Sequence, residues 1–289
     1  MIEVNRDILK EIFQEREKGK YYRKYDFGLV LVIGGGEFYS GSPALSAMAA
    51  FKTGCDMVRI ISPRRAADII ASFSPNLSAF PLEGKWLEEK HLPTLLSMTE
   101  AAKSVSRGNM AVVIGGGAGR SEETKKTISE YLSQIDIPAV VDAAAIHAVG
   151  EKPEIIKGKP FLITPHTFEF FVLTGREIYK LSHEEKQTVV KEEAEKWQTT
   201  ILLKEKPDII SDGQEIALNK AGTPYMSVGG TGDILAGVCG ALLARRINPF
   251  VAAQAGVFIA CRAGEMAAER LKDSLLATDI IETIPEVLH

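Results

Sequence analysis

Short apolar runs alternate with longer segments of helical periodicity over most of the chain. The short runs are rich in β-branched residues and too brief for helices, so they predict buried strands. These strands are expected at residues 28–33, 57–61, 110–114, 138–142, 160–163 and 200–203. Helix-spaced apolar positions lie between them, including residues 43–53, 122–133 and 183–197. This alternation predicts an α/β fold with a mostly parallel central sheet between two layers of helices.

The pattern changes in the last third of the chain. Two short runs, 208–211 and 215–219, flank the turn sequence DGQ and predict a hairpin. Helical periodicity then predicts helices at residues 234–246, 249–271 and 274–287. No linker, low-complexity tract or internal repeat divides the chain. We therefore expect one domain over residues 1–289, in which residues 1–24 form a helical lead-in to the first strand.

Composition and charge narrow the class of protein. The chain is 45% hydrophobic and 25% charged, as globular proteins are. Its 34 basic and 38 acidic residues give a net charge of −4, which argues against nucleic-acid binding, and the basic run KGKYYRK at 18–24 is interpreted as a solvated connector. The three widely spaced cysteines predict neither a disulfide nor a zinc site. We expect a cytoplasmic protein with no membrane contact, because the sequence shows no signal-peptide core and no membrane-length apolar run.

Two glycine clusters directly follow predicted strands. The sequences VIGGGEFYSGS and VVIGGGAGRS begin at residues 32 and 112. Ligands of open α/β sheets bind beyond the carboxyl ends of the strands, and glycines let the backbone approach a ligand closely. Each cluster alone is as typical of a tight turn, but together they predict a shared ligand cleft. Neither matches G-x-G-x-x-G or a Walker A loop, which disfavours a Rossmann dehydrogenase and a P-loop NTPase.

A third small-residue stretch, GGTGD, ends at Asp233 and runs into an apolar helix. An aspartate here is typical of an ordinary helix start. The glycine turn and the free N–H groups of the helix start also form an anion site. A carboxylate would repel a resident phosphate, but it suits the transfer of a phosphoryl group to a hydroxyl whose proton it accepts. The stretch therefore predicts a kinase-like site with Asp233 as general base.

Three further polar side chains follow predicted strands. Asp142 is expected either to hold magnesium through water or to cap the next helix. For His166, which stands three residues before Glu169, the alternatives are ligand contact, a structural role and shared metal ligation. Lys204 is expected to reach a phosphate or to lie on the surface. No metal ligand is assigned from these positions alone.

The ordered set of motifs resembles the ribokinase-like NAD(P)H-hydrate dehydratases. The stretch GGTGDILAG at 229–237 carries the resemblance, with NKAGTPYMSV before it and PFVAAQAGVFIACRAGEMAAE after it. The first strand with its glycines, then VVIGGGAGRSEET and LITPHTFEFFVLTG, occur in the family's order, and the similarity extends over about residues 25–269. The resemblance implies a three-layer α/β/α ribokinase-like fold. Family members often carry an N-terminal epimerase domain, which the short segment before the first strand leads us not to expect here.

The resemblance also implies a cofactor-repair reaction. The enzyme would use ADP or ATP, with Mg²⁺, to remove water from the 6-hydroxy form of NAD(P)H. Because hydroxide leaves poorly, the ring hydroxyl would first be phosphorylated and phosphate would then be lost. The resemblance further implies a homo-oligomer, specifically a tetramer. It leaves open the choice between ADP and ATP and that between hydrated NADH and hydrated NADPH.

The resemblance assigns roles to individual positions. Asp233 would contact the substrate and act as the base. Further substrate contacts would come from Ser42, Gly117, Gly119 and His166. The nucleotide would lie against Gly230, Thr231, Gly232 and the segment Lys204, Glu205, Lys206, Pro207 and Asp208.

Several positions depart from the family's pattern. They are Gly116 and Ala118 in the glycine turn, Ala144 and His147 after the strand at 138–142, and Glu205 and Asp208 in the nucleotide segment. The two acids add negative charge beside a polyphosphate, which Lys204, Lys206 or a metal would have to offset. Two alternative functions stay open: a small-molecule alcohol kinase of the same fold, of the vitamin-precursor type, and a nucleotide sensor without turnover.

Overall fold

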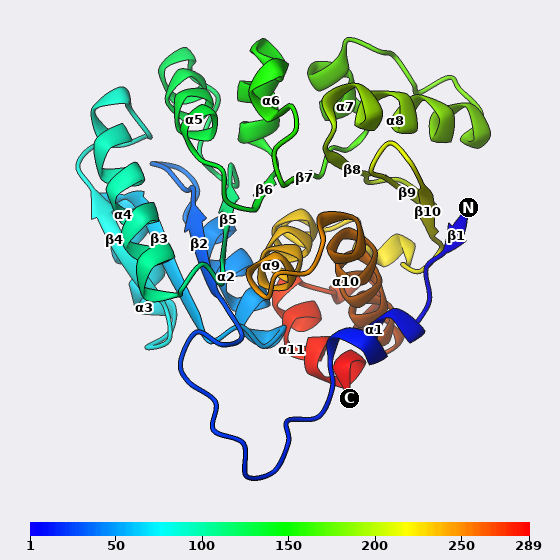
Figure 1. Ribbon diagram of the computed structural model, residues 1–289, viewed down its shortest axis with the longest axis horizontal. Coiled ribbons are helices and arrows are strands. Elements are labelled where there is room, and N and C mark those ends of the chain that lie inside the picture. Colours follow the sequence, from blue (N-terminus) through cyan, green and yellow to red (C-terminus); the bar gives the residue numbers. More distant parts are fainter.

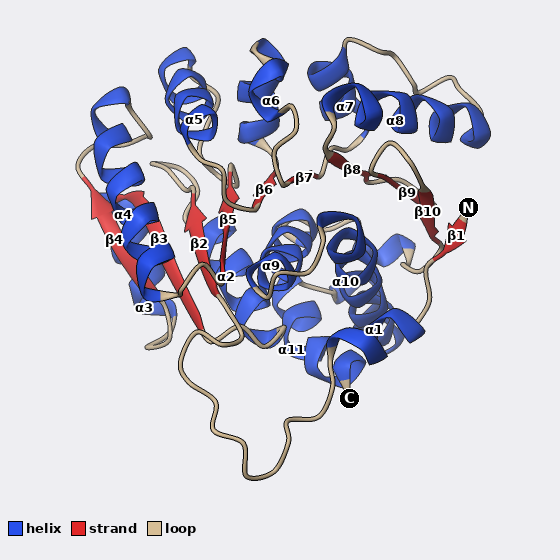
Figure 2. Cartoon of the chain, in the orientation of Figure 1, coloured by secondary structure: helices blue, strands red, loops and turns tan.

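Ten strands form one continuous sheet in the computed structural model, which describes residues 1–289 (Figures 1 and 2). Their order across the sheet is β1-β10-β9-β8-β7-β6-β5-β2-β3-β4. The strands from β2 to β8 are parallel to one another, and only β9 runs antiparallel to the two strands beside it, β8 and β10. The strands are β1 (Ile2–Glu3), β2 (Leu29–Ile33), β3 (Met57–Pro63), β4 (Ser78–Leu82), β5 (Met110–Ile114), β6 (Ala139–Val141), β7 (Phe161–Ile163), β8 (Thr200–Leu203), β9 (Asp208–Ser211) and β10 (Ile216–Asn219).

Alternate residues of the central strands feed two separate cores. In β2, Leu29, Leu31 and Ile33 join the core on one face of the sheet, whereas Val30 and Val32 join the core on the other. Successive side chains of a strand point to opposite faces, so a run of five apolar residues is buried only if both faces are covered. This burial on both faces confirms the prediction made from the uninterrupted apolar run.

Helices cover both faces and complete the three-layer α/β/α architecture that was predicted (Figure 1). One face packs against α4 (Leu92–Val105), α5 (Glu122–Gln134), α6 (Ala144–Glu151), α7 (Thr167–Thr174) and α8 (His183–Trp197). The other packs against α1 (Asp7–Ile12), α2 (Gly41–Lys52), α3 (Arg64–Phe73), α9 (Thr231–Ala244), α10 (Pro249–Leu271) and α11 (Ala277–Leu288). None of these helices has the length and apolar content that crossing a bilayer requires.

The N-terminal segment differs from its prediction. Of residues 1–24, only the six residues of α1 are helical, and Ile2–Glu3 instead form β1 beside β10. Leu9 and Ile12 bury one side of α1. The following residues up to 28 contain no helix, because residues 14–20 are exposed polar positions that offer no apolar stripe to pack. The helical lead-in is therefore wrong beyond α1.

The order of the strands creates a crevice above β2. The chain adds β3 and β4 on one side of β2 and then returns to add β5 on its other side. Ligands of open α/β sheets bind at such a switch in strand order, at the carboxyl ends of the strands. Helix α9 packs beneath this crevice, close against α2 and β5, because Gly237 faces the Ser46 carbonyl and Gly240 faces Val113. Its N-terminus reaches the ends of the strands.

Candidate active site

The glycine loops after β2 and β5 touch each other. The Gly35 N–H donates to the Gly116 carbonyl at 2.8 Å. A Cβ atom at Gly34 would overlap the same carbonyl oxygen, so no larger residue fits between the loops. The two clusters therefore form one floor, which is the shared cleft that the sequence predicts.

Asp233 projects from the first turn of α9 onto this floor. The helix is preceded by Gly230, whose φ of 100° favours glycine, and no side chain caps its free N–H groups. The Asp233 carboxylate accepts a hydrogen bond from the Ser42 hydroxyl. A Cβ atom at Gly116 would lie 2.8 Å from Asp233 Oδ1, so the glycine lets the carboxylate rest on the loop.

The surroundings of Asp233 shift its proton equilibrium. Burial raises its pKa to about 6, and the nearby carboxylate of Asp142 also raises it, while the hydroxyl of Ser42 and the charge of Lys204 lower it. The group is therefore ionised at neutral pH, yet it holds a proton more firmly than a solvated aspartate does. A general base works best when its pKa lies near the working pH.

Lys204 lies inside a cluster of buried charges. Its ammonium donates to Asp142 Oδ1 at 2.8 Å and lies 3.7 Å from Glu169 Oε2. Both acids are nearly fully buried. Burial alone would lower the pKa of Lys204, but the carboxylates of Asp142 and Glu169 outweigh it and raise that pKa. Lys204 is thus no surface lysine.

Asp142 does not cap the helix that follows it, so that one of its two predicted roles is wrong. Ala143 precedes α6, and no side chain caps that helix. Asp142 Oδ1 instead accepts hydrogen bonds from Lys204 and, at 2.7 Å, from Thr164. Its Oδ2 accepts no hydrogen bond from the protein and faces Gly232 at the start of α9, where a Cβ atom would lie 3.9 Å away. This free oxygen fits water-mediated contact with a magnesium ion that a nucleotide brings, since Mg²⁺ uses few protein carboxylates.

His166 has a structural role. Its Nδ1 accepts the backbone N–H groups of Phe168 and Glu169, and Glu169 returns the bond to the His166 N–H at 3.0 Å, which forms a capping box at the start of α7. The described chain contains no group of three or more His, Cys, Asp or Glu residues that would hold a metal. The ring edge at Nε2 remains half exposed beside the cluster of buried charges.

A cavity of about 440 Å³ is lined on one side by Lys204, Glu205, Lys206 and Asp208, and on the other by Ala221, Gly222, Thr223, Pro224, Met226, Ser227 and Cys261. Lys204 belongs both to this cavity and to the charge cluster below α9, and a Cβ atom at Gly232 would lie 3.7 Å from its ammonium. The predicted nucleotide residues are therefore brought together around one lysine. Thr231 stands at the start of α9 but its hydroxyl already donates to the Val228 carbonyl at 3.2 Å.

The two acids that depart from the family's pattern are offset by partners that the sequence did not suggest. Glu205 forms an ion pair with Lys186 of α8. Asp208 accepts the Asn219 amide at 2.8 Å and the Glu205 N–H at 3.1 Å, and its burial raises its pKa to about 6. Lys206 donates its hydrogen bonds to backbone carbonyls beyond β10, and its charge still lowers the pKa of Asp208.

Sequence reasoning missed two aromatic residues above the glycine floor. The Trp86 indole lies against Gly36 and Gly119, where an added Cβ atom would overlap it or come within 3.0 Å. The Tyr39 ring lies against Gly117, and burial and the Asp233 carboxylate raise the pKa of Tyr39. Both residues stand in loops that lack any motif, so only the tertiary contacts identify them.

Two other departures lie behind the site. Ala144 is buried at the first turn of α6, so this departure serves packing. The Nε2 atom of His147 is buried without a hydrogen-bond partner. Burial, followed by the charge of Arg120, lowers the pKa of His147. The lowered pKa favours the neutral imidazole at this departure.

Known proteins resemble this chain over nearly its whole length. The family model described as NAD(P)H-hydrate dehydratase matches residues 30–286. The bifunctional NAD(P)H-hydrate repair enzyme Nnr of Pyrobaculum aerophilum is 39% identical over 269 residues, which are 92% of this chain and 52% of that protein. The ADP-dependent (S)-NAD(P)H-hydrate dehydratase of Cenarchaeum symbiosum is 34% identical over 286 residues, 99% of this chain and 96% of that protein.

A solved structure has the same fold. The ADP/ATP-dependent NAD(P)H-hydrate dehydratase of Bacillus subtilis, co-crystallised with ATP and Mg²⁺, superimposes with a TM-score of 0.77 at 21% identity, covering 98% of this chain and 96% of that one. The chain spans about half the length of the bifunctional relatives that it matches.

Proposed function

The chain belongs to the NAD(P)H-hydrate dehydratase family, and we propose that it uses ADP or ATP to convert the 6-hydroxy form of NAD(P)H back to NAD(P)H. One observation carries this proposal: Asp233 stands between the glycine floor and a nucleotide-sized cavity, beside the free N–H groups of α9. This arrangement provides a base, an anion site and, beside Lys204, a cavity for the nucleotide. Residues 1–289 act as one dehydratase domain, which the single continuous sheet supports.

The nucleotide occupies the cavity beside Lys204–Asp208. From there its phosphates extend past Lys204 to the N-terminus of α9, where Gly230, Thr231 and Gly232 present backbone N–H groups. Negative charge that develops on the moving phosphoryl group is stabilised by these fixed dipoles. Bound with the nucleotide, Mg²⁺ supplies charge neutralisation between the phosphates, and Asp142 Oδ2 is the group that would face it.

The hydrated nicotinamide ring lies on the glycine floor. Ser42, Gly117 and Gly119 line this side, and Trp86 and Tyr39 offer aromatic faces to a ring. His166 contacts the substrate through its exposed ring edge, because its Nδ1 accepts the hydrogen bonds that cap α7. Ser42 holds the Asp233 carboxylate in place through its hydrogen bond.

Asp233 accepts the proton of the ring hydroxyl as that oxygen attacks the terminal phosphoryl group. The bond between this group and the nucleotide breaks, and the nucleotide leaves one phosphate shorter. The ring nitrogen then donates its lone pair, phosphate departs from carbon six, and loss of a proton from carbon five restores the dihydropyridine. Water has to be excluded during these steps because the intermediate is reactive.

A coupled optical measurement tests the proposed function. Purified protein, Mg²⁺ and hydrated NADH are mixed with ADP or ATP, and the return of dihydronicotinamide absorbance is followed together with the release of inorganic phosphate. Recovery of both signals supports the dehydratase and identifies the phosphate donor. A stable phosphorylated alcohol from a different substrate, without recovery of the cofactor, would replace it by the small-molecule kinase. Tight nucleotide binding without any turnover would favour the sensor.

Assembly and location are separate proposals. We infer a cytoplasmic homotetramer from membership of the family, and the three free cysteines are in keeping with a reducing compartment. Light scattering coupled to size-exclusion chromatography tests the assembly, and a monomer in solution at working concentration would reject it.

A further inference from the structure

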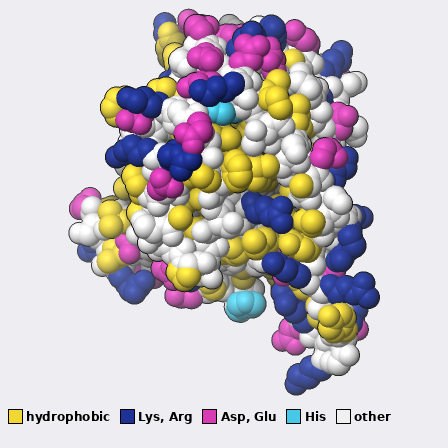
Figure 3. Space-filling view, turned by 90° about the vertical axis from the view of Figure 1, so that its left-hand side faces the viewer, with side chains coloured by type: hydrophobic (Ala, Val, Ile, Leu, Met, Phe, Trp, Pro, Cys, Tyr) yellow, Lys and Arg dark blue, Asp and Glu magenta, His cyan; other side chains and the backbone are white.

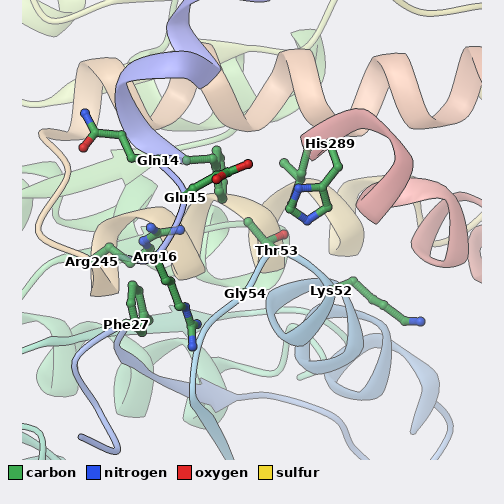
Figure 4. A pocket seen from close by; sticks show the side chains of 11 residues that line it. Gln14, Glu15, Arg16, Phe27, Lys52, Thr53, Gly54, Arg245 and His289 are labelled. Carbon is green, nitrogen blue, oxygen red and sulfur yellow. The ribbon is translucent and has the colours of Figure 1, made fainter. Parts of the chain in front are cut away.

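A cavity of about 530 Å³ lies at the opposite end of α9 from Asp233. Arg245 directly follows the helix and stands 12 residues after Asp233, so about 18 Å of helix separates this cavity from the catalytic carboxylate. Residues 13–16 and Phe27 form one wall, the end of α2 forms another, and Leu288 and His289 close the third (Figure 4). None of these residues belongs to the active site.

Two arginines converge in this cavity. The guanidinium of Arg16 lies 3.8 Å from the centre of the Phe27 ring, and that of Arg245 lies 5.4 Å from the same ring and 4.8 Å from Phe13 (Figure 4). Stacking on aromatic faces fixes a guanidinium while leaving its N–H groups free. Arg245 uses one N–H for the Ile12 carbonyl at 3.2 Å.

No carboxylate lies within 4.0 Å of either guanidinium, although the charge of Asp56 acts on Arg245. Every ion pair within 4.0 Å in the chain involves other basic groups, and Lys52 at the rim is already paired with Glu282 at 2.7 Å. The acids that face the cavity are Glu15 at its wall and Asp56 behind Arg245, whose Oδ2 accepts the Phe27 N–H at 2.8 Å. Burial, followed by the charge of Arg16, lowers the pKa of Arg245. An anion between the two guanidiniums would offset both the burial of Arg245 and its repulsion from Arg16.

We propose that Arg16 and Arg245 form a second ligand site, which binds the phosphate group of a small phosphorylated molecule. Two fixed guanidinium forks match the charge and the oxygen geometry of a phosphate dianion. The cavity exceeds the volume of a phosphate alone, so it leaves room for an organic part, and Gln14 and Thr53 supply further polar groups. Basic side chains of residues 16–24 gather on the protruding segment below the molecule and attract anions to this end (Figure 3).

Titration calorimetry with inorganic pyrophosphate at low ionic strength tests this site on the complete chain. The wild type should bind pyrophosphate, and Arg16→Ala should weaken that binding about tenfold or more, since it removes a charge-assisted contact. Arg16 lies on an exposed segment, so the variant keeps the fold. Arg246→Ala is the matched control: its guanidinium is exposed, next in sequence, and bonded to the Arg107 carbonyl at 2.9 Å, so binding should be unchanged.

A second variant protects the test against folding artefacts. Arg245→Lys keeps the positive charge but loses the planar fork, so it should also weaken binding while circular dichroism stays native. The absence of any heat of binding would overturn the proposal. Equal affinity of the wild type and Arg16→Ala would also overturn it, because the anion would then bind at the start of α9. Capture of an acidic peptide without pyrophosphate binding would overturn it too.

Discussion

At the scale of single residues, the candidate site is a set of opposed charges held at close range. Asp233 is half-buried beside another carboxylate, Asp142, and only Lys204 and the Ser42 hydroxyl moderate that repulsion. The same lysine lines the cavity proposed for the nucleotide. One cation thus links the base to the anion site. Glu205 forms its ion pair with a different lysine, Lys186.

Replacing Asp233 by asparagine should lower kcat about 10²–10⁴-fold, because the amide retains the size of the carboxylate but accepts no proton. Nucleotide affinity should change little, because the N–H groups of α9 and the cavity beside Lys204 remain. Steady-state rates and calorimetry with ADP check the two expectations. Near-normal turnover in this variant would remove Asp233 from the role of base.

The raised pKa of Asp233 predicts a pH profile. Plots of kcat/KM should fall tenfold per unit below about pH 6, where the base becomes protonated, and the residual rate of Asp233→Asn should lack this limb. The free energy of unfolding has the opposite pH dependence and falls as the pH rises. The folded pKa lies above the ordinary value of 3.8, so the folded state binds the proton more tightly and this group's contribution is lost as the pH rises from about 4 to 6. Urea unfolding should therefore favour the Asn variant increasingly over that range; a constant difference would contradict the assignment.

Lys204→Met should destabilise the protein by about 3 kcal/mol or more, because it leaves Asp142 and Glu169 buried without their cation. Lys220→Met is the matched control, since Lys220 forms an exposed pair with Glu3 at the same distance range, 2.7 Å, and such pairs contribute less than about 1 kcal/mol. Denaturant unfolding measures both. Equal losses would mean that the buried cluster is no more important than a surface pair.

Residue-level prediction succeeded where a local pattern carries the chemistry. The glycine turn before Asp233 predicts an exposed helix start, and the glycines of the loops after β2 and β5 predict that the backbone approaches a neighbour closely. The two partners of Lys204, Asp142 and Glu169, come from separate segments, so no spacing along the chain reveals them. Trp86 and Tyr39 escaped prediction for the same reason.

At the scale of elements, the position of α9 depends on Gly237 and Gly240, which have no side chain at its contacts with α2 and β5. Gly237 lets the helix approach α2, and the Ser46 hydroxyl donates to the Asp233 carbonyl at 2.9 Å across that contact. The apolar strands and the long helices were predictable because their periodicity is strong. Strand β4 was not predicted, because its SAFPL sequence alternates between half-exposed and exposed positions at the edge of the sheet and contains a proline.

Gly237→Ala should lower stability by about 1–3 kcal/mol, because its Cβ atom would overlap the backbone of Ser46 and force α9 away from α2. Gly229→Ala provides a comparison, since a Cβ atom there meets nothing within 4 Å. The free energy of unfolding of that variant should stay within about 0.5 kcal/mol of the wild type. Two variants with the same stability would show that the helices can separate without cost.

At the scale of the whole molecule, the site lies where the two parts of the sheet meet. Strands β2 to β4 supply one glycine loop, β5 to β10 supply the other loop and the nucleotide segment, and α9 joins them from below. A nucleotide that contacts both Lys204 and the start of α9 therefore stabilises the entire fold rather than one loop.

ADP at about one hundred times its Kd should stabilise the protein by about 2.7 kcal/mol, which raises the Tm by roughly 5 °C for a chain of this size. Adenosine at the same concentration should produce a smaller shift, because it lacks the phosphates that face α9. Differential scanning calorimetry with Mg²⁺ present measures both. An equal shift with adenosine would place the binding energy entirely in the cavity beside Lys204.

The packing of α9 against α2 also has a consequence for biosynthesis. The two helices begin about 190 residues apart in the chain, and the base is attached to the later one. A nascent chain that has emerged from the ribosome only as far as β10 already contains both glycine loops and the nucleotide segment, yet it has no helix to fill the space below β5 and no group to accept a proton. Contacts between such distant segments form slowly and late. Catalytic competence therefore arises in one step near the end of synthesis, when α9 inserts and closes the core and the active site together.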